Sequence, residues 1–202
     1  MVKKIIIPPY KEAIKEASKI LKKGGIIIYP TDTLYGLGGD GTNSKTIKKI
    51  MKIKRRKKDA FSVIVAKSKI KKYCKIEKQY YKKLDKLLPG PYTFLLEAKK
   101  KIAATKNKTI GIRVPKNKFC LRLAEKFGKP IISTSANISG KSPKFRVEDI
   151  EKEIKDKVDL IIDGGPTKYK IGSTIVDLIN KKIIRVGAGY KKIKEIFNDF
   201  HE

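Results

Sequence analysis

Short apolar runs alternate with amphipathic stretches along almost the whole chain, and this alternation restricts the fold more than any other feature. Apolar residues spaced three or four apart predict helices, whereas short runs rich in Ile, Val and Phe predict buried strands. Helices are expected over residues 10–23, 44–54, 77–88, 118–128, 147–158 and 190–200. Strands are expected over residues 26–29, 61–66, 92–98, 109–114, 130–134, 159–163, 173–179 and 182–186. Because some strands follow one another directly, the pattern predicts α/β architecture with a mixed sheet.

The length of 202 residues favours one domain spanning residues 1–202, since no repeat, linker or low-complexity tract divides the chain. No apolar run approaches the roughly 20 residues that a membrane helix needs. The basic N-terminal segment "MVKKIIIPPYKEA" has an apolar core too short for a signal peptide. We therefore expect a cytoplasmic protein that does not contact the membrane.

The distribution of His and Cys excludes several kinds of chemistry. The single histidine, His201, is the penultimate residue, a poor place for the fixed imidazole that a catalytic triad requires. Cys74 and Cys120 lie far apart with no C-x-x-C spacing, so two reduced thiols are expected. Catalysis is left to carboxylates, hydroxyls, lysines, arginines, backbone amides or a metal held by carboxylates.

The formal net charge is +30, from 50 Lys and Arg against 20 Asp and Glu, and such a field attracts nucleotides and nucleic acids. Lysines are spread along the whole chain, however, so a general bias toward lysine explains the charge equally well. Arginine is rare, and its planar fork binds carboxylates and phosphates with two hydrogen bonds. The six arginines are Arg55, Arg56, Arg113, Arg122, Arg146 and Arg185.

Two glycine-containing segments come close to phosphate-binding motifs but fit them poorly. "YPTDTLYGLGGDGTN" (29–43) contains G-x-G-x-x-G, but five residues separate the expected strand from Tyr35 and the first glycine. A dinucleotide-binding fold places that glycine turn between the strand and a helix. "SANISGKS" (135–142) nearly matches a P-loop, but Ser135 replaces its first glycine and Pro143 follows at once. Neither motif is therefore the preferred interpretation.

Three loops rich in hydroxyl groups lie at the ends of expected strands, where α/β sheets gather ligands. They are "PTDT" (30–33), "STSAN" (133–137) and "GST" (172–174), and Arg56, Arg113 and Arg185 also lie near strand ends. Turn formation alone is the alternative explanation for such residues. Without a usable histidine, hydroxyls and arginines suit phosphoryl or nucleotidyl transfer, which depends on positioning and electrostatic stabilisation.

Seven segments occur in the same order as in a known family, from about residue 10 to residue 190, and together they are highly specific. They are "YPTDTLYGLGGD", "KRRKKDAFSVIV", "PGPYTFLLEAKK", "IGIRVPKN", "STSANISGKSP", "DGGPTKYKIGSTIVDL" and "IIRVGA". The chain resembles the YrdC-type L-threonylcarbamoyladenylate synthases, in their single-domain form without the extra C-terminal domain of longer members. The resemblance implies a twisted mixed sheet with flanking helices around a deep basic cavity.

The same resemblance implies a nucleotidyltransferase that forms threonylcarbamoyl-AMP and pyrophosphate from L-threonine, bicarbonate and ATP, with Mg²⁺ as the expected metal. The product would supply a tRNA-modifying complex that makes threonylcarbamoyl-adenosine. Lys54 and Arg56, of a K-x-R element, would grip the ATP phosphates and serve in catalysis. The residues implied for L-threonine are Thr33 (at the cavity mouth), Thr109, Arg113, Ser135 and Ser173. Those implied for ATP, besides the K-x-R pair, are Asn137, Ser142, Lys144 and Arg185.

Some details depart from the family pattern or need a particular local structure. Lys57 stands where the family usually has proline, Gly172 replaces a frequent glutamate, and the loop "SGKSPKF" (139–145) is one residue short. For Lys54 and Arg56 to bind one triphosphate, the helix must end near Ile53. On a continuing helix, side chains that are two residues apart point in different directions. The glycines after "PTDT" are expected to let the backbone turn beneath a substrate lip.

Two other functions are compatible with the same residues. One is an RNA-binding module of the same fold, for double-stranded RNA or tRNA, and a weak affinity for RNA fits the charge. Its weakness is the lack of an aromatic strand on which bases could stack. The other is a relative with the same fold that forms a different acyl-adenylate.

Overall fold

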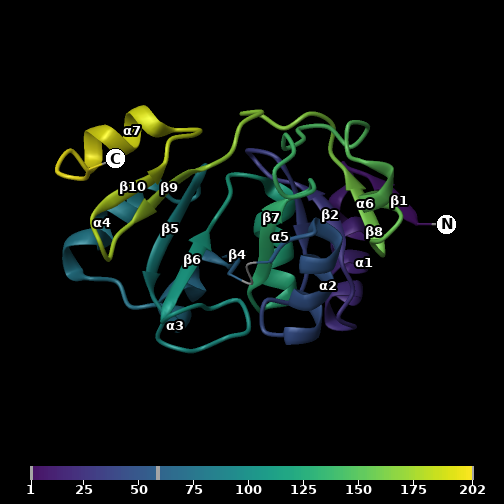
Figure 1. The fold of residues 1–202 in the computed structure, drawn as a ribbon, viewed down its shortest axis with the longest axis horizontal. Coiled ribbons are helices and arrows are strands. Elements are labelled where there is room, and N and C mark those ends of the chain that lie inside the picture. Colours follow the sequence, from purple (N-terminus) through teal and green to yellow (C-terminus); the bar gives the residue numbers. More distant parts are fainter. Residues whose placement is uncertain (1, 58–59, 202) are drawn as a thin grey trace.

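The computed structural model describes residues 2–57 and 60–201. Within them, ten strands form one sheet in the order β1-β8-β2-β3-β7-β4-β6-β5-β9-β10 (Figure 1). Parallel pairs join β1 to β8, β8 to β2, β4 to β6 and β5 to β9, and the other neighbours are antiparallel. The predicted mixed α/β architecture, with helices beside a large twisted sheet, is confirmed.

The strands are β1 (Lys3–Ile6), β2 (Ile27–Pro30), β3 (Tyr35–Gly38), β4 (Ser62–Ile64), β5 (Tyr92–Glu97), β6 (Thr109–Arg113), β7 (Ile131–Ser135), β8 (Leu160–Asp163), β9 (Thr174–Asp177) and β10 (Lys182–Arg185). The helices are α1 (Tyr10–Lys22), α2 (Ser44–Lys54), α3 (Ile70–Tyr73), α4 (Lys78–Leu87), α5 (Lys118–Phe127), α6 (Lys152–Lys155) and α7 (Tyr190–Ile196), with a short 3₁₀ turn over Lys67–Lys69.

Apolar side chains on alternate strand positions divide between two cores. Ile27 and Tyr29 of β2 face the cluster formed with helices α1 and α5, which pack together. Ile28 of β2 and Leu37 of β3 face the other cluster, to which α2 contributes its buried isoleucines. Helices therefore cover both faces of this half of the sheet, as Figure 1 shows.

The predicted helix over residues 147–158 is wrong, because only α6 forms there. Val147, Ile150 and Ile154 are buried at helix-like spacing, yet the chain before α6 is a series of turns. Lys155 Nζ lies 3.4 Å from the carbonyl oxygen of Val147 and 3.2 Å from that of Glu148. The Lys155 side chain thus contacts carbonyl groups that would accept hydrogen bonds within a helix. The helix-like spacing of the buried apolar residues therefore arises from turns.

Gly36 and Gly38 of "GLGG" lie in strand β3, so the expectation that these glycines turn the backbone beneath a lip is wrong. β3 runs antiparallel to β2, with Gly36 opposite Tyr29. A Cβ atom on Gly38 would lie 2.6 Å from Tyr29 Cε1, and one on Gly36 would lie 3.2 Å from Tyr29 Cζ. These glycines leave room for the buried Tyr29 ring. The dinucleotide-binding interpretation fails for the same reason, since α2 begins only at Ser44.

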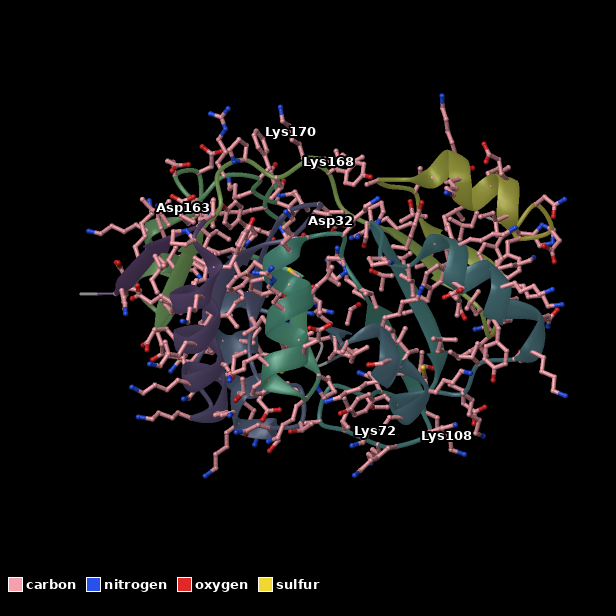
Figure 2. All side chains as sticks on the ribbon, turned by 180° about the vertical axis from the view of Figure 1, so that it is seen from behind. Asp32, Lys72, Lys108, Asp163, Lys168 and Lys170 are labelled. Atoms are coloured by element: carbon pink, nitrogen blue, oxygen red, sulfur yellow. The ribbon has the colours of Figure 1, made fainter. Side chains whose placement is uncertain are left out.

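Lysine side chains project from the molecule on several sides. Figure 2 shows Lys168 and Lys170 at one edge of the molecule and Lys72 and Lys108 at the opposite edge, and all four are exposed. Asp32, by contrast, lies inside the molecule and is 3% exposed. Much of the positive charge is therefore spread over the surface. No helix in the described part of the chain is both long and apolar enough to cross a membrane.

Candidate active site

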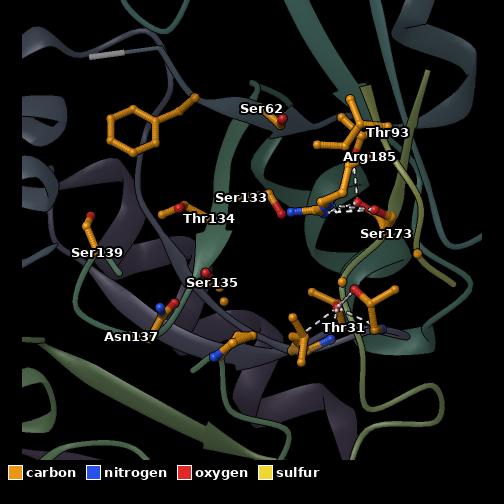
Figure 3. A pocket seen from close by; sticks show the side chains of 18 of the residues that line it. Thr31, Ser62, Thr93, Ser133, Thr134, Ser135, Asn137, Ser139, Ser173 and Arg185 are labelled. Atoms are coloured by element: carbon orange, nitrogen blue, oxygen red, sulfur yellow. Dashed lines mark hydrogen bonds between the residues drawn. The ribbon is translucent and has the colours of Figure 1, made fainter. Parts of the chain in front are cut away.

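A cavity of about 890 Å³ lies at the ends of several strands, and the loops that follow these strands form its sides. Its walls come from the β2–β3 turn, the end of α2, strands β4 to β7, the loop after β7, and strands β9 and β10. Figure 3 shows the hydroxyl and amide side chains that point into it. The implied site residues found in this lining are Thr33, Lys54, Arg56, Arg113, Ser135, Asn137, Ser173 and Arg185.

Three implied site residues lie outside this lining. Thr109 begins β6, at the end of the strand opposite to Arg113, and lines a separate cavity of about 270 Å³. Ser142 is exposed on the loop after β7. Lys144 Nζ lies 3.9 Å from Glu151 Oε1, and the Lys144 carbonyl accepts a hydrogen bond from the Tyr35 amide. Their assigned roles stay predictions that the geometry of the cavity does not support.

The turn between β2 and β3 is a buried wall of the cavity and not an exposed lip at its mouth. Thr31, Asp32 and Thr33 are 2%, 3% and 1% exposed. The Thr31 hydroxyl donates to the Leu34 carbonyl at 2.7 Å and lies 3.0 Å from the Thr33 hydroxyl. Thr167 also donates to the Thr33 carbonyl at 2.6 Å. The expected place of Thr33 at the mouth is therefore wrong, because these bonds hold the turn inside the protein.

Arg113, the last residue of β6, is held by three side chains from two segments, the β2–β3 turn and β7. Its Nη2 donates to Thr33 Oγ1 at 2.9 Å and lies 3.4 Å from Asp32 Oδ1, while Nη1 donates to Ser133 Oγ at 3.2 Å. Asp32 Oδ2 accepts from the Lys116 amide at 2.8 Å. The buried Arg113 Nε has no hydrogen-bond partner. Three side chains thus determine the position of the guanidinium, and Arg113 lines the cavity.

The sequence reasoning did not assign Asp32 or Ser133 to the site. Burial raises the pKa of the Asp32 carboxyl, while Arg113 and the Lys116 amide act in the opposite direction. The one available signal was an acid between two threonines in "PTDT", together with a rare arginine elsewhere in the chain. That these two residues pair is a fact of the tertiary structure.

The end of α2 brings Lys54 and Arg56 to the same cavity. The helix ends at Lys54, and Arg55 adopts a left-handed conformation with φ of 51°. The expected break in the helix is thereby confirmed. Arg56 stacks its guanidinium 4.7 Å from the centre of the Phe61 ring and donates to the Ala60 carbonyl at 2.9 Å. Both cations consequently line one wall although they are two residues apart.

Lys54 is a buried cation, 3% exposed, that donates to backbone carbonyls of the loop after β7. Its Nζ donates to the carbonyl oxygen of Ser135 and, at 2.7 Å, to that of Asn137. Burial, with the nearby charge of Arg56 as a second cause, lowers the pKa of Lys54 to about 8. The side chain therefore both fixes this loop and places a titratable charge in the cavity.

Arg185 is anchored on the opposite side of the cavity. Its Nε and Nη2 donate to the Ser173 carbonyl at 3.0 and 2.8 Å, and Ser173 Oγ lies 2.8 Å from Thr93 Oγ1. Burial and the charge of Arg113 lower the pKa of Arg185. Figure 3 shows Arg185, Ser173 and Thr93 together, across the cavity from Asn137. Arg185 thus lies with Ser173, a residue implied for threonine, although the resemblance implied that Arg185 binds ATP.

Comparison with known proteins agrees with this fold and cavity. A sequence model of the Sua5, YciO and YrdC proteins, described as "Telomere recombination", matches residues 19–187. The chain belongs to the Sua5/YciO/YrdC family. A Methanocaldococcus jannaschii family member, provisionally named a threonylcarbamoyl-AMP synthase, is 38% identical over 189 residues, which cover 92% of this chain and 90% of that protein. The Bos taurus threonylcarbamoyl-AMP synthase is 32% identical, over 95% of this chain and 74% of that protein.

Solved structures of the family have the same fold. Sua5 of P. abyssi, in a complex with L-threonine, superimposes with a TM-score of 0.89 at 25% identity, covering all of this chain. This chain spans 62% of the length of that Sua5. E. coli YciO superimposes with a TM-score of 0.84 at 30% identity, over 94% of this chain and 97% of YciO. The family therefore includes members of about this length.

Proposed function

We propose that this chain is an L-threonylcarbamoyladenylate synthase, which uses L-threonine, bicarbonate and ATP. The observation that carries the proposal is one cavity with the fixed guanidinium of Arg113 on one side and the Lys54–Arg56 pair on another. An amino acid and a triphosphate are two anions that such a cavity can hold together. Its volume of about 890 Å³ lies in the range of cavities that hold ligands of this size.

Threonine is proposed to bind on the side of Arg113 and Ser173. The Arg113 guanidinium, which lines the cavity, can donate to the substrate carboxylate, while Asp32 and Thr33 keep it in position. The complex of P. abyssi Sua5 with L-threonine supports an amino-acid substrate for a cavity of this family. Ser135 lies between this group and Asn137, in β7.

ATP is proposed to bind with its phosphates at Lys54 and Arg56, near Asn137. The threonine nitrogen attacks the carbon of bicarbonate, and loss of water leaves a carbamate. A carbamate oxygen then attacks the α-phosphorus of ATP, so that the bond to the β-phosphate breaks and pyrophosphate leaves. The two cations stabilise negative charge as that bond breaks. Arg185, which faces them across the cavity, is proposed to meet the phosphate nearest to threonine.

A protein site for Mg²⁺ does not fit the residues present. Residues 2–57 and 60–201 contain no group of three His, Cys, Asp or Glu side chains that could hold a metal ion. Magnesium is commonly carried by substrate phosphates with few protein ligands. We therefore propose that any Mg²⁺ enters with the ATP phosphates, and that a separate tRNA-modifying system consumes the product.

The synthase and RNA-binding functions predict different results in one assay. Purified protein with labelled bicarbonate, ATP and L-threonine should form threonylcarbamoyl-AMP and pyrophosphate with no RNA present, because the cavity takes small molecules. The same assay with each of the twenty amino acids identifies the substrate. Label that enters product only after RNA is added would support the RNA-binding alternative, and label with another amino acid would support a different acyl-adenylate.

Arg56→Ala should weaken ATP binding by about 2 kcal/mol, roughly 30-fold, because it removes a charge-assisted contact with the phosphates. Calorimetric titration of ATP measures the effect, and urea unfolding checks that stability is kept. Lys48→Ala and Lys49→Ala are matched controls, since both lysines are exposed on the same helix α2. They should change ATP affinity little. Equal weakening in all three variants would mean that the overall positive field, and not a defined site, attracts ATP.

A further inference from the structure

Four side chains form a row across neighbouring strands on the cavity side of the sheet. The register pairs Thr93 of β5 with Ile175 of β9, and Ile175 with Arg185 of β10. Phe94 pairs with Ile112, so one further step of the antiparallel register brings Thr93 beside Arg113 of β6. All four of these side chains line the large cavity. Thr93 and Ile175 therefore form the floor between two arginines.

Ile175 leaves apolar surface uncovered within this polar cavity. Its neighbours Thr174 and Val176 point the other way and are 0% exposed, as expected for alternation along a strand. Ile175 is half-buried, and it lines the cavity. The surface that it still exposes is available to an apolar group of a ligand, because burying apolar surface away from water is favourable.

A hydroxyl pair lies directly beside this apolar surface. Thr93 Oγ1 and Ser173 Oγ are 2.8 Å apart, and either atom could donate the bond between them. Arg185 Nη2 also donates to Ser173 Oγ at 3.1 Å. A hydroxyl has one proton and two lone pairs, so the pair retains one proton and free lone pairs. It can therefore bond a ligand hydroxyl next to Ile175.

We propose that Thr93 and Ile175 contact the side chain of the amino-acid substrate and determine which amino acid binds. This inference rests on the proposed function. Ile175 contacts a methyl group, and the Thr93–Ser173 pair bonds a hydroxyl on the same carbon. Threonine presents both groups, serine lacks the methyl, and valine has a second methyl in place of the hydroxyl. With the carboxylate at Arg113, one cross-strand row then selects L-threonine against both analogues.

The test compares pyrophosphate release with threonine, serine and valine. The wild-type protein should prefer threonine to serine by about 10- to 200-fold in kcat/KM, the range that one methyl group provides in an apolar pocket. Ile175→Thr, which keeps a β-branched side chain in the strand, should lower this ratio about tenfold or more. Thr93→Val, of nearly the same shape, should lower the preference for threonine over valine by a similar factor.

Ile184→Thr is the matched control, because Ile184 lies on β10, is 54% exposed and is not among the residues lining the cavity. It should leave both ratios unchanged. If Ile175→Thr lowers kcat/KM equally for threonine and serine, its role is structural and the inference is wrong. Calorimetric titration with each amino acid alone tests the side-chain subsite separately from the proposed synthase activity. Selective threonine binding that Ile175→Thr abolishes would uphold the subsite even in a protein without synthase activity, and unselective binding would overturn it.

Discussion

Asp32→Ala is expected to lower the free energy of unfolding by about 3–5 kcal/mol, because it leaves the buried Arg113 charge without its counter-ion. Asp32 is 3% exposed and Arg113 is 8% exposed, so water replaces little of the lost interaction. The variant also frees the Lys116 amide, which donates to Asp32 at 2.8 Å. Urea unfolding followed by circular dichroism measures the change.

Two controls separate buried charge from ion pairing as such. Asp85→Ala breaks a shorter pair, Lys67–Asp85 at 2.6 Å, but both side chains are exposed, so stability should hardly change. Asp32→Ala combined with Arg113→Met removes both buried charges and should be more stable than Asp32→Ala alone. A double variant no more stable than the single one would show that packing of the turn, and not the charge, sets the cost.

Lys54 should give the protein two pH dependences of opposite sign. Its pKa is about 8 in the folded protein against 10.5 ordinarily, so between these values the folded protein loses a proton that the unfolded chain keeps. Stability should therefore rise as pH rises from 8 to 10.5, by about 3 kcal/mol in full, and fall by the same amount as pH is lowered from 10.5 to 8. ATP affinity should fall over the same range, because the neutral amine no longer attracts phosphate.

Lys54→Met should flatten both dependences, measured as the difference from wild type by urea unfolding and by ATP titration from pH 7 to 10. Slopes are compared and not absolute values, since the variant also loses the hydrogen bonds to the Ser135 and Asn137 carbonyls. The other titrating lysines are present in both proteins and cancel. A stability slope shared by both proteins would place the titration elsewhere. An ATP slope shared by both would mean that Lys54 does not contact the phosphates.

Segments whose structure follows from their own apolar spacing were well predicted. Segments whose structure depends on contacts with other parts of the chain were not. The apolar spacing of residues 44–54 and 118–128 led to α2 and α5 within one residue. Strand β3 was missed because glycine is a poor strand former, and its place is decided by the ring of Tyr29 on the paired strand. Residues 147–158 had helical spacing, but Lys155 bonds to the backbone there instead.

By itself, the sequence determined the α/β class, the family, the end of α2 before Arg56, and the hydroxyl-rich strand ends. These follow from local periodicity, turn chemistry and ordered motifs, which need no distant contact. Only the tertiary structure decided that Asp32 pairs with Arg113, 81 residues away, that Arg185 lies with Ser173, and that Thr109 lies outside the main cavity. The reason is the sheet register, because a neighbour across strands depends on which strands pair and in what alignment, and composition and spacing do not encode it directly.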